Sequence, residues 1–170
     1  MKINGYNCIN NSIGPGKGLA LYYSMEIFRP GPQVKENRIQ ISKLVSEEVD
    51  IIAIYRSNEG NLGELVKHLK TLIEEGKNTV VTGDLNICYS ANRNNIVTKY
   101  LENEGFIQYM KEATHIKGRH IDHFYLRHSE RPVNIAEMYR YSPYYSDHDA
   151  ICATIESFNT DRQEEGGKRK

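Results

Sequence analysis

The fold and the candidate site both follow from one stretch of the chain, Thr79-Val80-Val81-Thr82-Gly83-Asp84-Leu85-Asn86. Its opening residues form an apolar, β-branched run, and an acid and an amide come directly after that run. We therefore expect a strand over Thr79–Leu85 that ends in exposed polar side chains. A sheet can hold such side chains rigidly and still leave them accessible.

A second motif, Ser146-Asp147-His148, stands far along the chain, just before the apolar run Ala150–Ile155. It also places polar side chains next to a predicted strand. Aspartate, asparagine and histidine are the residue types that activate water, orient it and stabilise charge at a phosphate. Each motif alone is also typical of a polar turn, because Asp and Asn favour turns. The two together indicate a site built from distant segments.

The rest of the sequence alternates between predicted strands and helices. Val49–Tyr55 is apolar except for Asp50, which is typical of a strand covered on both faces. The clearest helix is Asn61–Glu75, where apolar residues recur at three- and four-residue spacing. The other predicted elements are strands at Leu19–Tyr23, Arg38–Leu44, Ile121–Leu126 and Ile151–Ile155, and a helix at Asn94–Glu104.

Composition sets ordinary limits. The 170 residues suggest one domain, and 22 basic against 22 acidic residues give no net charge. Bulk charge therefore does not support nucleic-acid binding, although a local basic face stays open. The three cysteines, Cys8, Cys88 and Cys152, are widely spaced, which predicts reduced thiols in an intracellular protein. No apolar run approaches the roughly 20 residues of a membrane span, so we expect no membrane partner.

Four segments occur together in a recognisable order: Ala53–Asn58, Gly83–Asn86, Arg119–Phe124 and Ser146–His148. Their order and spacing resemble the endonuclease/exonuclease/phosphatase superfamily, and Ala113–Gly118 looks like its retroelement branch. The resemblance covers roughly Gly5 to Glu156. It implies an α/β fold, a DNase I-like two-layer β-sandwich with helices packed outside both sheets.

The resemblance also predicts that the domain is incomplete on its N-terminal side. Members of the superfamily begin with a strand that carries an Asn, followed by a helix and a strand ending in the Glu that is the principal metal ligand. Neither Asn4 nor Glu26 matches these positions. We therefore expect residues 1–156 to form the later two-thirds of such a domain, and residues 157–170 to form a disordered polar tail.

The resemblance assigns a role to individual residues of this chain. His148 is similar to the histidine that contacts the scissile phosphate, and Asp122 to the carboxylate that pairs with it. Asp84 resembles the residue that positions or deprotonates the attacking water, and Asn86 the amide that orients this water or a phosphate oxygen. Tyr55 looks like the tyrosine that contacts the phosphate, with Asn58 assisting.

The same resemblance implies a divalent cofactor, Mg²⁺ or Mn²⁺, with Asp147 and Asp84 as its ligands. These two carboxylates alone make a poor cage, but Mg²⁺ can keep several waters. A zinc site on His115, His120 and His123 is a weaker alternative, because no cysteine lies near them in the sequence.

The sequence thus predicts a metal-dependent phosphodiesterase, most simply an endonuclease that acts on DNA as retroelement proteins do. Two alternatives remain open. The chain could be an inactive remnant of the fold that binds nucleic acid or protein, since the metal-ligand Glu is missing. It could also be a small-molecule or inositol phosphatase, because one fold supports several chemistries.

Overall fold

The computed structural model describes residues 3–14, 17–36 and 38–157. Its centre is a six-stranded mixed sheet with the order β3-β4-β5-β6-β8-β7. The strands are β3 (Arg29–Glu36), β4 (Ile39–Val45), β5 (Asp50–Arg56), β6 (Thr79–Asp84), β7 (Ile107–Gln108) and β8 (Asp122–Arg127). The β5–β6 pair is parallel, and β6–β8 is antiparallel.

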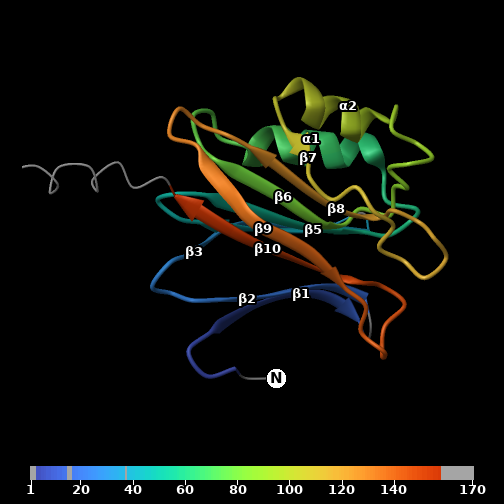
Figure 1. Cartoon of the computed structure of the whole chain (residues 1–170), viewed down its shortest axis with the longest axis horizontal. Helices are drawn as coiled ribbons and strands as arrows, with labels where there is room; N and C mark the ends of the chain where they lie inside the picture. The colour runs from blue at the N-terminus through green and yellow to red at the C-terminus, as the bar shows by residue number, and fades with distance from the viewer. Residues whose placement is uncertain (1–2, 15–16, 37, 158–170) are drawn as a thin grey trace, which may run out of the picture.

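Two helices cover one face of this sheet, α1 (Leu62–Leu72) and α2 (Ile96–Asn103) (Figure 1). Both have an asparagine N-cap: Asn61 and Asn95 each accept bonds from two backbone N–H groups at the helix start. Their apolar faces, including Leu65, Leu69 and Val97, share one buried cluster with Val81 and Tyr125 of the sheet. This cluster is the main core.

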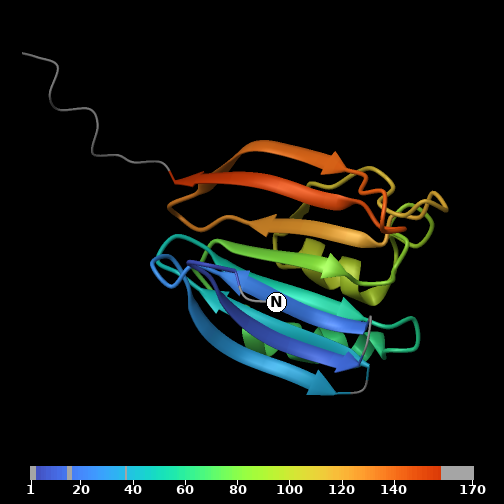
Figure 2. The same ribbon diagram turned by 90° about the horizontal axis from the view of Figure 1, so that it is seen from below.

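The opposite face of the sheet is covered by two hairpins, β1 (Asn7–Gly14) with β2 (Lys17–Tyr23) and β9 (Val133–Tyr141) with β10 (Ala150–Ser157) (Figure 2). Side chains alternate across each central strand, so Val80 and Phe124 face β9 and β10 while their neighbours Val81 and Tyr125 face the helices. Leu44 packs in the same way against Ile9 and Tyr23 of the other hairpin.

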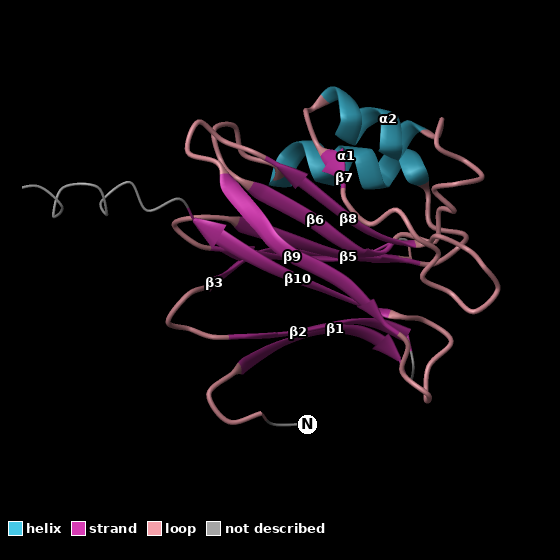
Figure 3. Cartoon of the chain, viewed as in Figure 1, coloured by secondary structure: helices cyan, strands magenta, loops and turns pink. Residues whose placement is uncertain are grey.

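The layered sandwich predicted from the sequence is confirmed, with one correction. We expected helices outside both layers, but in the described residues both helices lie on the six-stranded sheet alone (Figure 3). The strands β1, β3, β7 and β9 were also missed. The burial pattern of β9 and β10 explains the correction, because most of their residues are exposed or half-buried and leave no continuous apolar outer face for a helix.

The predicted tail begins one residue too early. Ser157, which the sequence assigned to the tail, is the last residue of β10. The remaining tail residues, 158–170, lie outside the described residues.

A buried ion pair joins the end of α1 to the sheet. The Lys43 ammonium lies 2.9 Å from Asp50 Oδ2, and both side chains are almost fully buried. It also donates to the Leu72 carbonyl at 2.9 Å and to Glu74 Oε1 at 2.6 Å. Lys43 therefore satisfies a free carbonyl at the helix end and neutralises a buried carboxylate at the same time.

We predict that Lys43→Met destabilises the chain by about 3–5 kcal/mol, because it leaves Asp50 charged, buried and unpaired. Urea denaturation measures this effect. The control is Lys67→Met, which removes an exposed ion pair with Glu64 and should cost less than about 1 kcal/mol. Adding Asp50→Leu to Lys43→Met should restore much of the loss. A double variant no more stable than Lys43→Met would contradict the role of the unpaired charge.

Gly83 fixes the close approach of β6 to β5. It has a φ of +124°, and a Cβ placed there would lie 2.1 Å from the Ile54 carbonyl oxygen of the paired strand. Only glycine fits this position, because backbone cannot move aside as a flexible side chain can. Gly83 thereby sets the position of Asp84, the next residue.

We predict that Gly83→Ala costs at least about 3 kcal/mol of stability, through the steric clash and the positive φ. The matched control is Gly118→Ala, where φ is also positive at +70° but nothing lies within 4 Å of an added Cβ. Thermal denaturation of both variants separates the two effects. Equal losses at the two positions would show that backbone strain alone accounts for Gly83.

Candidate active site

The predicted site residues gather at one end of the central sheet, around a cleft of about 680 Å³. The strand register aligns them: Tyr55 of β5 pairs with Asp84 of β6, and Asp84 pairs with Asp122 of β8. His148 reaches the same place from the loop before β10. The cleft lining includes Tyr55, Asn58, Asp84, Asn86, Asp147 and His148.

His148 and Asp122 form a hydrogen-bonded pair. His148 Nδ1 lies 2.9 Å from Asp122 Oδ2. The Thr114 hydroxyl donates to the same oxygen at 2.7 Å, and the Asp122 backbone N–H donates back to Thr114 Oγ1. Partial burial disfavours the charged imidazole, but the hydrogen bond and charge of Asp122 outweigh it and raise the pKa of His148. This pairing leaves Nε2 as the ring nitrogen free for a ligand.

Asp84 and Asn86 form a compact turn directly after β6. The Asn86 backbone N–H donates to Asp84 Oδ1 at 2.9 Å, and its side-chain amide donates to Asp84 Oδ2 at 3.0 Å. Asn86 holds a left-handed φ of 51°, which asparagine tolerates better than most residues. The carboxylate and the amide are thus fixed relative to each other.

The carboxyl group of Asp84 has an unusual environment. Burial and then the negative charge of Asp122 raise its pKa to about 6, against the opposing effects of the Asn86 N–H, His148 and Arg56. Two neighbouring carboxylates in a half-buried cleft repel each other, and a cation bound between them would relieve this repulsion. The pair Asp84 and Asp122 therefore fits a divalent ion that keeps several of its waters.

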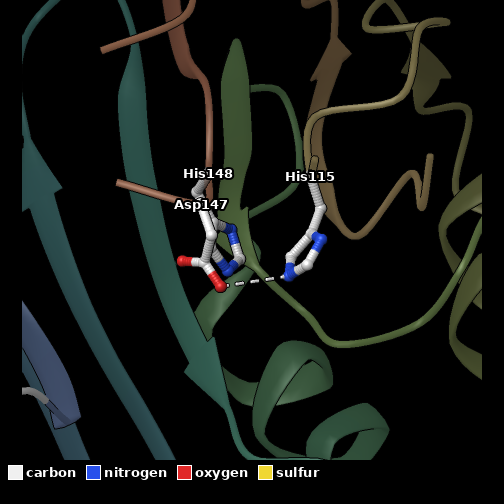
Figure 4. A group of neighbouring side chains, drawn as sticks. All are labelled: His115, Asp147 and His148. Atoms are coloured by element: carbon white, nitrogen blue, oxygen red, sulfur yellow. Dashed lines mark ion pairs between the residues drawn. The ribbon is translucent and has the colours of Figure 1, made fainter. Parts of the chain in front are cut away.

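The described residues contain two clusters of three candidate ligands around His148. One joins it to Asp84 and Asp122, and the other joins it to His115 and Asp147 (Figure 4). The predicted ligands Asp84 and Asp147 therefore stand in different clusters, and their joint role stays a prediction. The alternative hypothesis was a zinc site on His115, His120 and His123. Neither cluster contains His120 or His123. These two side chains are buried beside each other, with ring centroids 5.5 Å apart.

Sequence reasoning gave four residues that shape the site no role in phosphate binding or catalysis. Thr114 orients Asp122, while His115, Arg38 and Arg119 line the cleft. Thr114 and His115 stand in the segment that resembled the retroelement branch, which was the available signal. Arg38 gave no such signal, because its place depends on the turn between β3 and β4.

The sequence and fold were compared with known proteins. No protein-family model matches the sequence, and no curated protein matches it either. Solved structures do match the fold. The endonuclease domain of TRAS1, a telomere-specific non-LTR retrotransposon, superposes with a TM-score of 0.64 at 13% identity, over 91% of this chain and 79% of that chain.

An abasic-site (AP) endonuclease from Archaeoglobus fulgidus gives a TM-score of 0.61 at 16% identity, over 89% of this chain and 79% of that chain. TDP2 from D. rerio, complexed with a single strand DNA product, gives 0.59 at 13% identity, over 89% and 77%. The chain therefore has the same fold as these three proteins. The resemblance inferred from its motifs is confirmed at the level of the fold.

The raised pKa of Asp84 predicts a pH-dependent stability. The folded state holds this proton more tightly than the unfolded chain, so stability is greatest below the ordinary aspartate pKa of 3.8 and is lost as pH rises through about 6. Asp84→Asn removes this dependence. The free energy of unfolding of the variant, minus that of the wild type, should be about 2 kcal/mol larger at pH 7.5 than at pH 4.

Urea denaturation of both proteins at the two pH values tests this prediction. The hydrogen bonds that Asn86 loses in the variant shift stability equally at both pH values, so they cancel in the comparison. A difference between variant and wild type that does not change with pH would show that Asp84 carries no electrostatic strain.

Proposed function

We propose that this chain is a metal-dependent phosphodiesterase that cleaves DNA as an endonuclease. The observation behind the proposal is the His148–Asp122 pair set beside the Asp84–Asn86 turn in one cleft. These groups provide an imidazole, a carboxylate of raised pKa and an amide oxygen around a space large enough for a phosphodiester. The fold similarity to nucleases supports the same reaction class.

In this proposal Asp84 accepts the proton of the attacking water. In the metal-free chain the pKa of Asp84 is raised to about 6, so the carboxylate is ionised at neutral pH and can accept a proton. Asn86 fixes the orientation of that carboxylate. Because its amide hydrogens are donated to Asp84 and to the Arg56 carbonyl, its Oδ1 is the atom that can accept a hydrogen bond from the water. Tyr55 and Asn58, which line the same cleft, provide further donors to the phosphate.

His148, kept cationic by Asp122, stabilises the charge that develops on the phosphate oxygens. Its Nε2 faces away from Asp122 and can donate to a phosphate oxygen or to the leaving oxygen. Asp122 is itself held by Thr114, so the imidazole keeps one orientation. The dyad is therefore preorganised before the substrate arrives.

A divalent cation, Mg²⁺ or Mn²⁺, would polarise a phosphoryl oxygen and stabilise the leaving oxyanion. Asp84 and Asp147 are the proposed ligands, with Asp122 close to Asp84.

The structure was also searched for membrane-spanning helices, and among the described residues none has the length and apolar character that a span requires.

We predict that the purified chain nicks supercoiled plasmid in the presence of Mg²⁺, and that Asp84→Ala and His148→Ala each lower the rate at least about a hundredfold. EDTA should abolish cleavage. The matched controls are Glu130→Ala and His128→Ala, which replace exposed residues between β8 and β9 and should retain activity. Metal-dependent cleavage that survives both site substitutions would refute the proposed mechanism.

Two further measurements, DNA binding and release of phosphate from inositol phosphates, separate the alternatives. A folded protein that binds DNA without cutting it would be a remnant of the fold with a binding role. Faster release of phosphate from inositol phosphates than cleavage of DNA would identify a small-molecule phosphatase on this fold.

A further inference from the structure

The cleft contains a second pair of hydrogen-bond donors, His115 and Arg119, that the reaction described above does not use. Both belong to a tight turn: the backbone N–H groups of Thr114 and His115 donate to the Arg119 carbonyl, and the Gly118 N–H donates to the His115 carbonyl. The turn brings the two side chains together, with His115 Nε2 and Arg119 Nη2 3.3 Å apart. Both side chains line the cleft.

The hydrogen-bond pattern fixes the tautomer of His115. The Lys117 backbone N–H donates to His115 Nδ1 at 3.1 Å, so Nδ1 must offer its lone pair. The ring proton therefore lies on Nε2, which cannot accept a bond from Arg119. Two donors consequently face the same small space.

Among the described residues, Asp147 places an acceptor in that space. Asp147 Oδ2 lies 3.3 Å from His115 Nε2, and the dashed line in Figure 4 marks this contact. The His115 side chain is 4% exposed, whereas that of Asp147 is 62% exposed. The donor is thus rigid and the acceptor is a surface group held by a weak contact.

Arg119 has an unsatisfied donor in the part of the chain that the structure describes. Its Nε is buried and meets no acceptor among the described residues, and its Nη2 points at a nitrogen that carries a proton. A buried guanidinium N–H without an acceptor is costly, and a second donor stands beside it at Nη2, so this site favours an anion with several oxygens.

The loop contacts hold this arrangement next to His148. His115 and His148 form an isolated β-bridge, and their rings are 4.9 Å apart. The Ile116 N–H donates to the Asp147 carbonyl at 3.0 Å, and the Asp149 N–H donates to the Thr114 carbonyl at 2.7 Å. The backbone therefore fixes both loops, while the Asp147 side chain stays free to turn away.

We propose that His115 and Arg119 form a binding subsite for phosphate oxygens, and that the Asp147 carboxylate occupies this subsite in the free chain. The subsite deepens the proposed function, and rests on it for the nature of the substrate. A phosphate group of the substrate displaces Asp147 and accepts from His115 Nε2 and the Arg119 guanidinium together. In the metal-free chain Asp147 therefore competes with the phosphate, and its displacement frees the carboxylate for the role of metal ligand proposed above.

The test is a titration with inorganic phosphate at pH 7.5 in EDTA, followed at the His115 ring by NMR. Arg119→Met should weaken binding at least about tenfold, because it removes a charged donor pair. Asp147→Ala should tighten binding about tenfold, because it removes the competing carboxylate. The opposite signs distinguish a competitor from a residue that only maintains the structure.

Two matched controls remove general electrostatic effects. Glu59→Ala deletes another carboxylate of the cleft lining, and Arg131→Met deletes an exposed arginine outside it. Each should change phosphate binding at His115 less than threefold. Equal tightening by Glu59→Ala and Asp147→Ala would overturn the proposal, as would unchanged binding in Arg119→Met.

The outcome does not depend on catalysis. Phosphate binding with the expected signs in a protein that fails to cleave DNA would support the subsite and refute the nuclease. Should Arg119→Met fail to fold, the exposed position of Asp147 still provides the decisive variant, and the absence of tighter binding there would overturn the proposal.

Discussion

The buried guanidinium of Arg56 is the interaction on which the site depends. It ends β5, and its nitrogens donate to the carbonyls of Leu85 at 2.7 Å, Asn86 at 2.9 Å and Gly60 at 2.6 Å. The Arg56 carbonyl in turn accepts from the Asn86 amide at 2.9 Å. One side chain thus satisfies the free carbonyls of two loops and fixes the turn that carries Asp84 and Asn86. An Arg is suited to this role because its planar fork offers five donors.

The register of the central sheet brings the site residues together. Parallel pairing of β5 with β6 and antiparallel pairing of β6 with β8 put Tyr55, Asp84 and Asp122 in one row. Because side chains alternate across a strand, all three face away from the helices. His148 joins them through a loop anchored by Arg140, which donates to the Ala113 carbonyl and to Asp149. The site therefore combines a rigid row of strand ends with one pinned loop.

The elements that could be predicted from the sequence are those marked by a strong local pattern. The two helices and the strands at Asp50–Arg56 and Thr79–Asp84 have strong periodicity or apolar runs, and they were found to within a few residues. Strand β3 was missed because its Pro30-Gly31-Pro32 run reads as a break, and β9 because its alternation is interrupted by charged residues. The motifs correctly selected residues that meet in space, but contacts made by Arg56 and Thr114 depend on tertiary placement and leave no pattern in the sequence.

The charge distribution explains how a chain without net charge could recognise a polyanion. Zero net charge provides little long-range attraction. Within the cleft, however, Arg119 and His115 are donors held by a backbone turn, and Asp84 faces the negative charge of Asp122, which a cation would offset. Binding in such a site is governed by short, directed contacts that form after encounter. It follows that recognition here should depend weakly on salt and strongly on single donors, unlike binding through an extended basic surface.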